Sequence, residues 1–120
     1  MDLADLIDRY CSVWSEPDAS RRQAVLNTLW GEGAAYTDPR VHAEDGAALL
    51  SHISKVQASR PGSKVIRISA IDAHHGIARF AWRAIGADGA LLVDGIDIAF
   101  ISADGNRIER IIGFFETGQV

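Results

Sequence analysis

The stretch AAYTDP, residues 34–39, is a short apolar run that ends in a carboxylate directly before a proline. A residue that precedes proline is pushed towards extended backbone, so we expect a small strand over residues 34–38 with Asp38 at its end. A carboxylate held at a strand end is a candidate general base. The alternative is an ordinary Asp-Pro turn, which is the commoner meaning of this pattern. The rest of the chain has to decide whether Asp38 is a general base or a turn residue.

Two helices are expected before this stretch. The apolar residues of the first helix recur at steps of three and four, the pattern of one buried helix face; they are Leu3, Leu6, Ile7, Tyr10, Val13 and Trp14. Tyr10 lies within this face, so its hydroxyl needs a buried partner or a cavity. The second helix is expected to begin at Ser20, with Asp18 as the alternative cap. It carries Trp30 on its inner face and ends at residues 31–33, Gly-Glu-Gly.

A third helix is expected after a polar loop over residues 40–44. Asp45 is its predicted cap, and the Arg-Pro-Gly-Ser segment at residues 60–63 ends it. One face of this helix carries Leu49, His52, Ile53 and Val56. Because His52 shares the inner face with aliphatic residues, it is a candidate for the rim of a pocket.

Beyond residue 62 the apolar pattern changes from helical spacing to alternation, which indicates strands. The expected strands are residues 65–73, 77–85, 91–101 and 108–115. Short turns that contain glycine join consecutive strands, as in an antiparallel meander, and His74 and His75 lie in the first of these turns. Helices followed by strands predict a single α+β domain over residues 1–120.

Both faces of the strand over residues 91–101 are largely apolar. A strand that is apolar on both faces is covered on both. Three helices can cover one face of the sheet. We expect a second copy of the chain to cover the other, as a homodimer packed sheet to sheet.

Asp97 interrupts one of these apolar rows with a carboxylate. Burial at such a position raises the pKa of an aspartate, and a neutral aspartic acid can donate a hydrogen bond to a developing oxyanion. The alternative is a structural aspartate that is satisfied by backbone groups or by an arginine such as Arg67.

Composition and charge exclude several classes of function. The formal net charge is −4 and no basic run exists, so no nucleic-acid partner is expected. Cys11 is the lone cysteine, and neither a metal-ligand spacing nor a glycine-rich nucleotide loop is present, so no metal or cofactor is expected. Acids in residues 1–5, where a signal peptide carries bases, and the lack of a membrane-length apolar run favour a soluble, cytoplasmic protein.

In its layout the chain resembles the nuclear transport factor 2-like superfamily, also called SnoaL-like. The residues that carry the resemblance are spread over nearly the whole chain: they are Arg9-Tyr10, Trp14, Tyr36-Thr37-Asp38-Pro39, Gly46, Gly95-Ile96-Asp97, Asp104-Gly105, Arg107-Ile108 and Phe114-Phe115. The resemblance implies a cystatin-like α+β fold. In that fold a cone-shaped, curved antiparallel sheet and three helices from the N-terminal half enclose a pocket.

Within the superfamily, Tyr10, Asp38 and Asp97 are similar to the catalytic set of ketosteroid isomerases. The similarity implies an isomerase in which Asp38 is the general base for proton transfer next to a carbonyl. Tyr10 and Asp97 would donate hydrogen bonds to the oxyanion of a small apolar substrate, steroid-like or polyketide-like. The expected ligand contacts are Trp14, Tyr36, His52, Phe80, Trp82 and Phe115, with Trp30 as a further candidate for the pocket lining.

Three other functions stay open at this point. Polyketide cyclases of the superfamily use an aspartate with a histidine, for which His52, His74 and His75 are the candidates. A protein that carries a small ligand without chemistry would have the same fold. So would a dimeric interaction domain, as in the transport factor that names the superfamily.

Overall fold

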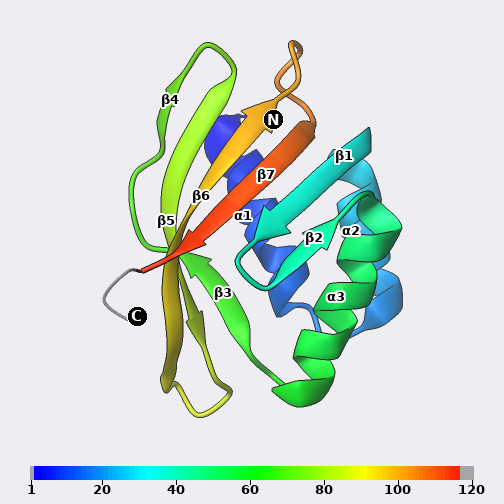
Figure 1. Cartoon of the computed structure of the whole chain (residues 1–120), viewed down its shortest axis with the longest axis vertical. Coiled ribbons are helices and arrows are strands. Elements are labelled where there is room, and N and C mark those ends of the chain that lie inside the picture. Colours follow the sequence, from blue (N-terminus) through cyan, green and yellow to red (C-terminus); the bar gives the residue numbers. More distant parts are fainter. Residues whose placement is uncertain (1, 117–120) are drawn as a thin grey trace.

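Three helices and a seven-stranded mixed sheet make up the part of the chain that the computed structural model describes, residues 2–116 (Figure 1). The helices are α1 (Leu3–Ser15), α2 (Ala19–Leu29) and α3 (Gly46–Ser59). The strands are β1 (Trp30–Asp38), β2 (Val41–Ala43), β3 (Lys64–Arg67), β4 (Asp72–His74), β5 (Ile77–Ile85), β6 (Leu91–Ile101) and β7 (Ile108–Phe115). The predicted α+β class is confirmed, and so are the bounds of the last three strands.

An aspartate caps each helix. The side chains of Asp2, Asp18 and Asp45 accept hydrogen bonds from backbone N–H groups in the first turns of α1, α2 and α3, at 2.8, 2.8 and 2.9 Å. A carboxylate in this place satisfies an N–H group that has no partner within the helix. Asp45 is thus the predicted cap, whereas α2 is capped by Asp18 and the expectation of Ser20 is wrong.

Trp30 belongs to strand β1, and its expected place on the second helix is wrong. Helix α2 ends at Leu29, and the chain continues at once as β1. The glycines of residues 31–33 form an irregularity within the strand, because the register with β7 shifts between Trp30 and Ala35. Gly33 supplies the positive φ (73°) that this bulge requires.

Two further boundaries differ from the expectation. Residues 40–44 are not a plain loop, because β2 pairs with β1 in a hairpin that Asp38 closes by accepting from the backbone N–H groups of Arg40 and Val41. The strand expected over residues 65–73 is broken into β3 and β4. At the break, the Ser69 hydroxyl accepts from the backbone N–H of Ala81 (2.8 Å), in place of a backbone carbonyl.

The sheet has the strand order β2-β1-β7-β6-β5-β3, with β4 on the same edge of β5 as β3. Strands β5, β6 and β7 form the expected antiparallel meander. Strand β1, however, lies parallel to β7, so the sheet is mixed, and the expectation of a wholly antiparallel sheet is wrong. This pairing brings residues 35–37 of the first half of the chain against residues 110–112 near its end.

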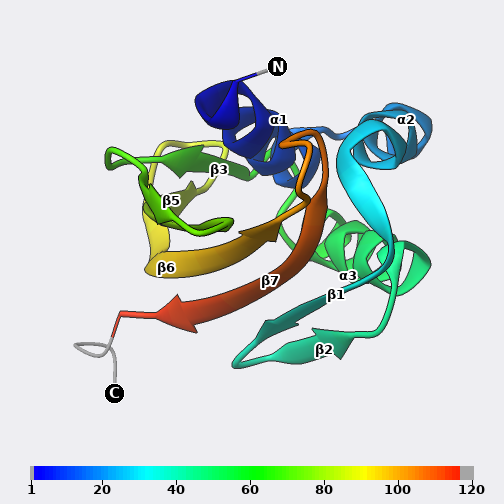
Figure 2. The ribbon, with the colours of Figure 1, turned by 90° about the horizontal axis from the view of Figure 1, so that it is seen from above.

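The sheet curves, and the three helices lie on its inner side (Figure 2). The core between them is almost wholly aliphatic and aromatic, with Leu6, Ile7, Leu29, Leu49 and Ile111 completely buried. None of the helices in residues 2–116 is both long and apolar enough to cross a membrane.

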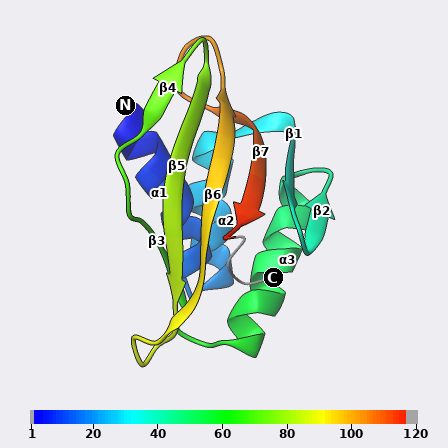
Figure 3. The same cartoon turned by 60° about the vertical axis from the view of Figure 1, so that its left-hand side comes forward.

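The outer face of the sheet stays uncovered in the single chain, and Figure 3 shows β5 and β6 in front of the helices. Ile96 and Phe114 are cross-strand partners on this face, and they are 38% and 58% exposed. Ile66 on β3 is also exposed. Exposed apolar side chains on one face of a sheet are typical of interaction surfaces.

We expect the homodimer that the sequence predicts to use this face. Light scattering at micromolar concentration should then give about twice the chain mass of 13.0 kDa. The variant Ile96→Glu should shift the protein to monomer, because it places an unpaired charge in the apolar contact. The control Ala24→Glu changes an exposed residue of α2 and should leave the dimer intact. A wild-type monomer would contradict the expectation.

Candidate functional site

Tyr10, Asp38 and Asp97 line one cavity of about 380 Å³. They come from three separate elements: the middle of α1, the end of β1 and the middle of β6. The volume lies within the range of small-molecule sites. The structure thus brings the three predicted residues to one place, between the helices and the inner face of the sheet.

Asp38 is both a turn residue and a cavity residue. Its Oδ1 accepts from the backbone N–H groups of Arg40 (2.7 Å) and Val41 (3.1 Å), which is the turn that the Asp-Pro sequence favours. Its Oδ2 accepts from the Tyr36 hydroxyl at 2.6 Å. A carboxylate oxygen has two lone pairs, so Oδ2 keeps one for a further proton. The turn therefore orients the carboxylate without using up its capacity as a base.

Asp97 is buried, with 4% of its surface exposed. Burial raises its pKa to about 7, against the effect of the Trp82 indole, whose Nε1–H donates to Oδ1 at 2.9 Å. The nearby charge of Asp38 raises the pKa further. Asp97 thus stays protonated to a pH at which an ordinary aspartate is ionised, as its apolar row predicts.

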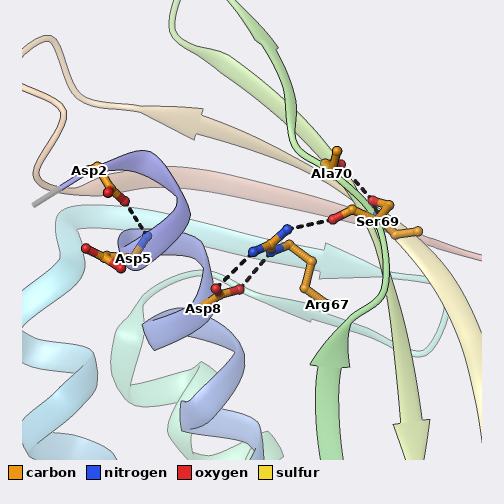
Figure 4. A network of polar contacts seen from close by, with 7 residues as sticks. Asp2, Asp5, Asp8, Arg67, Ser69 and Ala70 are labelled. Carbon is orange, nitrogen blue, oxygen red and sulfur yellow. Dashed lines mark hydrogen bonds and ion pairs between the residues drawn. The ribbon is translucent and has the colours of Figure 1, made fainter.

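Arg67 is not the partner of Asp97. Its guanidinium forms an ion pair with Asp8 of α1, with Nε 2.7 Å from Oδ1, and also donates to the backbone oxygen of Ser69 (Figure 4). The alternative in which an arginine neutralises Asp97 is therefore wrong. Asp97 has an indole instead of a cation beside it.

Two glycines make room around Asp97. A Cβ atom on Gly95 would lie 2.2 Å from the Trp82 ring, so only glycine lets the indole cross β6 and reach the carboxyl. A Cβ on Gly113 would lie 2.7 Å from Asp97 Oδ1 and 3.4 Å from the Cβ of Asp38. The two carboxyl groups therefore flank the space that Gly113 leaves open.

Tyr10 offers its hydroxyl proton to the cavity. Its oxygen accepts from the Trp14 indole (2.9 Å), one helical turn along α1, and its ring stacks on Trp30. Burial and the nearby Asp97 raise the pKa of Tyr10 well above its usual value, so the hydroxyl is a donor at any physiological pH. A hydroxyl that accepts from one side can donate to the other.

Most of the expected ligand contacts lie in the cavity wall, namely Trp14, Tyr36, His52, Trp82 and Phe115. Phe80 does not, because it is buried in the core on the inner face of β5. Trp30 also lies in the core, where its indole donates to the backbone oxygen of Ala34. Burial lowers the pKa of His52, whose ring packs edge-on against Trp14, so His52 is neutral at pH 7.

A basic rim is the part of the site that was not expected. Its members are Arg40, Lys55, Arg60 and Lys64, all exposed and all in the wall of the same cavity. They come from the β1–β2 turn, from α3 and from the segment that leads into β3. Lys55, Arg60 and Lys64 are close in sequence, and the fold adds Arg40 from the β1–β2 turn and directs all four to one cavity.

Comparison with known proteins identifies the fold. No protein-family model and no curated protein sequence matches the chain. Among solved structures, a proposed isomerase of the SnoaL-like family from Agrobacterium tumefaciens is 27% identical, with a TM-score of 0.86 over 94% of this chain and 96% of that one.

Two more distant structures share the fold alone. A nuclear transport factor 2-like protein of unknown function from Cytophaga hutchinsonii is 9% identical, with a TM-score of 0.70 over 99% of this chain and 94% of the other. A proposed SnoaL-like polyketide cyclase from Jannaschia is 8% identical, with a TM-score of 0.70 over 97% and 88%. The predicted resemblance to the superfamily is confirmed, and the closer likeness to ketosteroid isomerases stays a prediction.

The raised pKa of Asp97 predicts a specific dependence of stability on pH. Between about 4 and 7 the folded chain holds a proton that the unfolded chain releases, so the free energy of unfolding falls as pH rises. A shift from 3.8 to about 7 is worth on the order of 4 kcal/mol. Urea denaturation of wild type and Asp97→Asn should diverge across this range, with the variant relatively more stable at pH 8. Parallel curves would contradict the assignment.

Proposed function

We propose that this chain, which has the nuclear transport factor 2-like (SnoaL-like) fold, is a cofactor-free enzyme of the isomerase type. Its substrate would be a small apolar compound with a carbonyl group, steroid-like or polyketide-like. The observation that carries the proposal is the meeting of one base and two neutral proton donors in one aromatic cavity.

Asp38 is the base in this proposal. Its Oδ2 takes a proton from the carbon next to the carbonyl, and the electron pair of that C–H bond moves into the carbonyl to form an enolate. In a substrate with a carbon–carbon double bond β,γ to the carbonyl, the protonated Asp38 then gives the proton to the γ carbon. The carbonyl re-forms as the enolate electrons move, and the double bond shifts to the α,β position. The hydrogen bonds to Oδ1 hold the carboxylate in one orientation throughout, which favours a base that acts twice.

Tyr10 and Asp97 stabilise the intermediate. When Asp38 takes the proton, the negative charge passes to the enolate oxygen. Hydrogen-bond donors that point at this oxygen therefore lower the barrier to proton removal. In their neutral forms both groups are donors, in a cavity lined largely by aromatic and apolar side chains, where such hydrogen bonds are stronger than in water. Trp14 and Trp82 accept no proton in this scheme. They hold the two donors in place by the hydrogen bonds from their indole N–H groups.

A cyclase is the second candidate function, because His52 lies in the same cavity as Asp38. A neutral imidazole can take the proton of a carbon acid whose enolate then attacks a second carbonyl of the same molecule. His74 and His75 are exposed at the β4–β5 turn and lie outside this cavity. A ligand-binding protein without chemistry remains the alternative if no proton transfer is found.

Substitution of the base tests the proposal directly. The wild type should convert 5-androstene-3,17-dione or 3-cyclohexen-1-one to the conjugated ketone, with a rise in ultraviolet absorbance. Asp38→Asn should lower the turnover number by a factor of about 10² to 10⁴, the usual contribution of a general base. Asp88→Asn, at an exposed turn aspartate, is the matched control and should be fully active. Equal rates for both variants would contradict the role of Asp38.

The dependence of turnover on pH tests the second donor. The turnover number should fall as pH rises through about 7, because Asp97 then ionises, stops donating and repels the enolate. Asp97→Asn keeps an N–H donor and cannot ionise, so its lower rate should no longer show this fall. A fall of the same size and midpoint in the variant would assign the titration to another group.

A further inference from the structure

The basic rim sets the electrostatics of the cavity mouth. Both lysines of the chain and two of its ten arginines lie there, although the chain as a whole has a net charge of −4. Clefts lined by charge of one sign concentrate the field and attract ligands of the opposite sign. The mouth is therefore positive on a protein that is otherwise negative.

The rim side chains lie outside the ion pairs of the described residues. The ion pairs among residues 2–116 engage Arg67, Arg79 and Arg83, and none of them involves a rim residue. The carboxylates in the cavity wall are Asp38 and Asp97. The four rim cations outnumber these two carboxylates, and Asp97 is ionised only in part at neutral pH. The positive charge of the rim thus exceeds the negative charge of the carboxylates in the cavity wall.

The rim is also held in place. Gln57 of α3 is buried, and its Nε2 donates to the backbone oxygens of Trp14 (2.8 Å) and Ser63 (3.0 Å). This fixes the segment from residue 60 to 64 against α1. On the opposite side of the mouth, the guanidinium of Arg40 lies over the Phe115 ring at 4.9 Å.

We propose that the substrate is an apolar carbonyl compound with a carboxylate, and that the rim binds this carboxylate while the carbonyl reaches Tyr10 and Asp97. The inference rests on the proposed function, since it names the class of substrate for the same site. A carboxylate is favoured over a phosphate because the rim stands at the C-terminal end of α3, whose free carbonyls oppose a doubly charged group.

Two ligands of the same shape test the charge preference. The probes are 2-naphthylacetate and 2-naphthylacetamide, which have nearly the same shape and differ in the charge of the end group. Their affinities are measured by calorimetry at low ionic strength. The wild type should bind the carboxylate about tenfold more tightly, and the preference should shrink as salt is added. Equal affinities would overturn the inference. Failure of both probes to bind would overturn it together with the role of the cavity as a ligand site.

Replacement of the two lysines tests whether the preference for the carboxylate probe arises at the rim. In Lys55→Gln/Lys64→Gln the preference should fall below about twofold, because two exposed charges at the mouth are gone. Both side chains are exposed, so the fold should tolerate the change. The control Arg21→Gln/Arg110→Gln removes the same charge from exposed positions outside the cavity and should keep the preference. A preference that survives in the lysine variant would overturn the inference.

The two proposals fail in different ways. The charge preference is measured at equilibrium, so it should persist in Asp38→Asn, which lacks the base. If the protein converts neutral ketones but binds the two probes equally, the proposed function stands and the proposal of a substrate with a carboxylate is wrong. A protein that prefers the carboxylate but shows no dependence of turnover on Asp38 would bind acidic ligands without the proposed chemistry.

Discussion

The hydrogen bond from the Trp82 indole to Asp97 is the interaction on which the rest of the cavity depends. A carboxyl group that is 4% exposed in an apolar strand is costly unless it has a partner. An arginine would have offset that cost by stabilising the ionised form of Asp97. An indole satisfies one oxygen and lowers the pKa only in part, so burial still holds the pKa at about 7. Gly95 is the residue that lets the indole reach this position.

The site combines rigid and solvated parts. Tyr10 and Asp97 lie on the inner faces of a helix and a central strand, where the surrounding core buries both side chains. Asp38 stands at a strand end, where the turn to β2 supplies two backbone donors to its carboxylate. The basic rim lies further out, on exposed side chains, and Gln57 anchors the segment that carries two of them, Arg60 and Lys64. The cavity therefore runs from neutral donors inside to cations outside.

Local patterns predicted much of this fold. Strands β5, β6 and β7 have the expected bounds because alternation and glycine turns are properties of neighbouring residues. Asp97 could be singled out for the same reason, as one polar residue in an apolar row. The start of β1 at Trp30 was missed, because a segment with two glycines ends a helix more often than it continues a strand. The partner of Arg67 and the grouping of Arg40 with Lys64 depend on contacts between distant segments, which no local pattern contains.

The parallel pairing of β1 with β7 has a consequence for the order in which the protein is made. Strand β1 has β2 and β7 as its partners in the sheet, so its end is tied to the rest of the sheet only when residues 108–115 are in place. Asp38 is synthesised before β7, so its distance from Asp97 is set by a segment that is made later in the same chain. During folding, contacts between distant parts of a chain form more slowly than contacts between neighbours. A nascent chain without β7 thus holds all three polar residues and no assembled site.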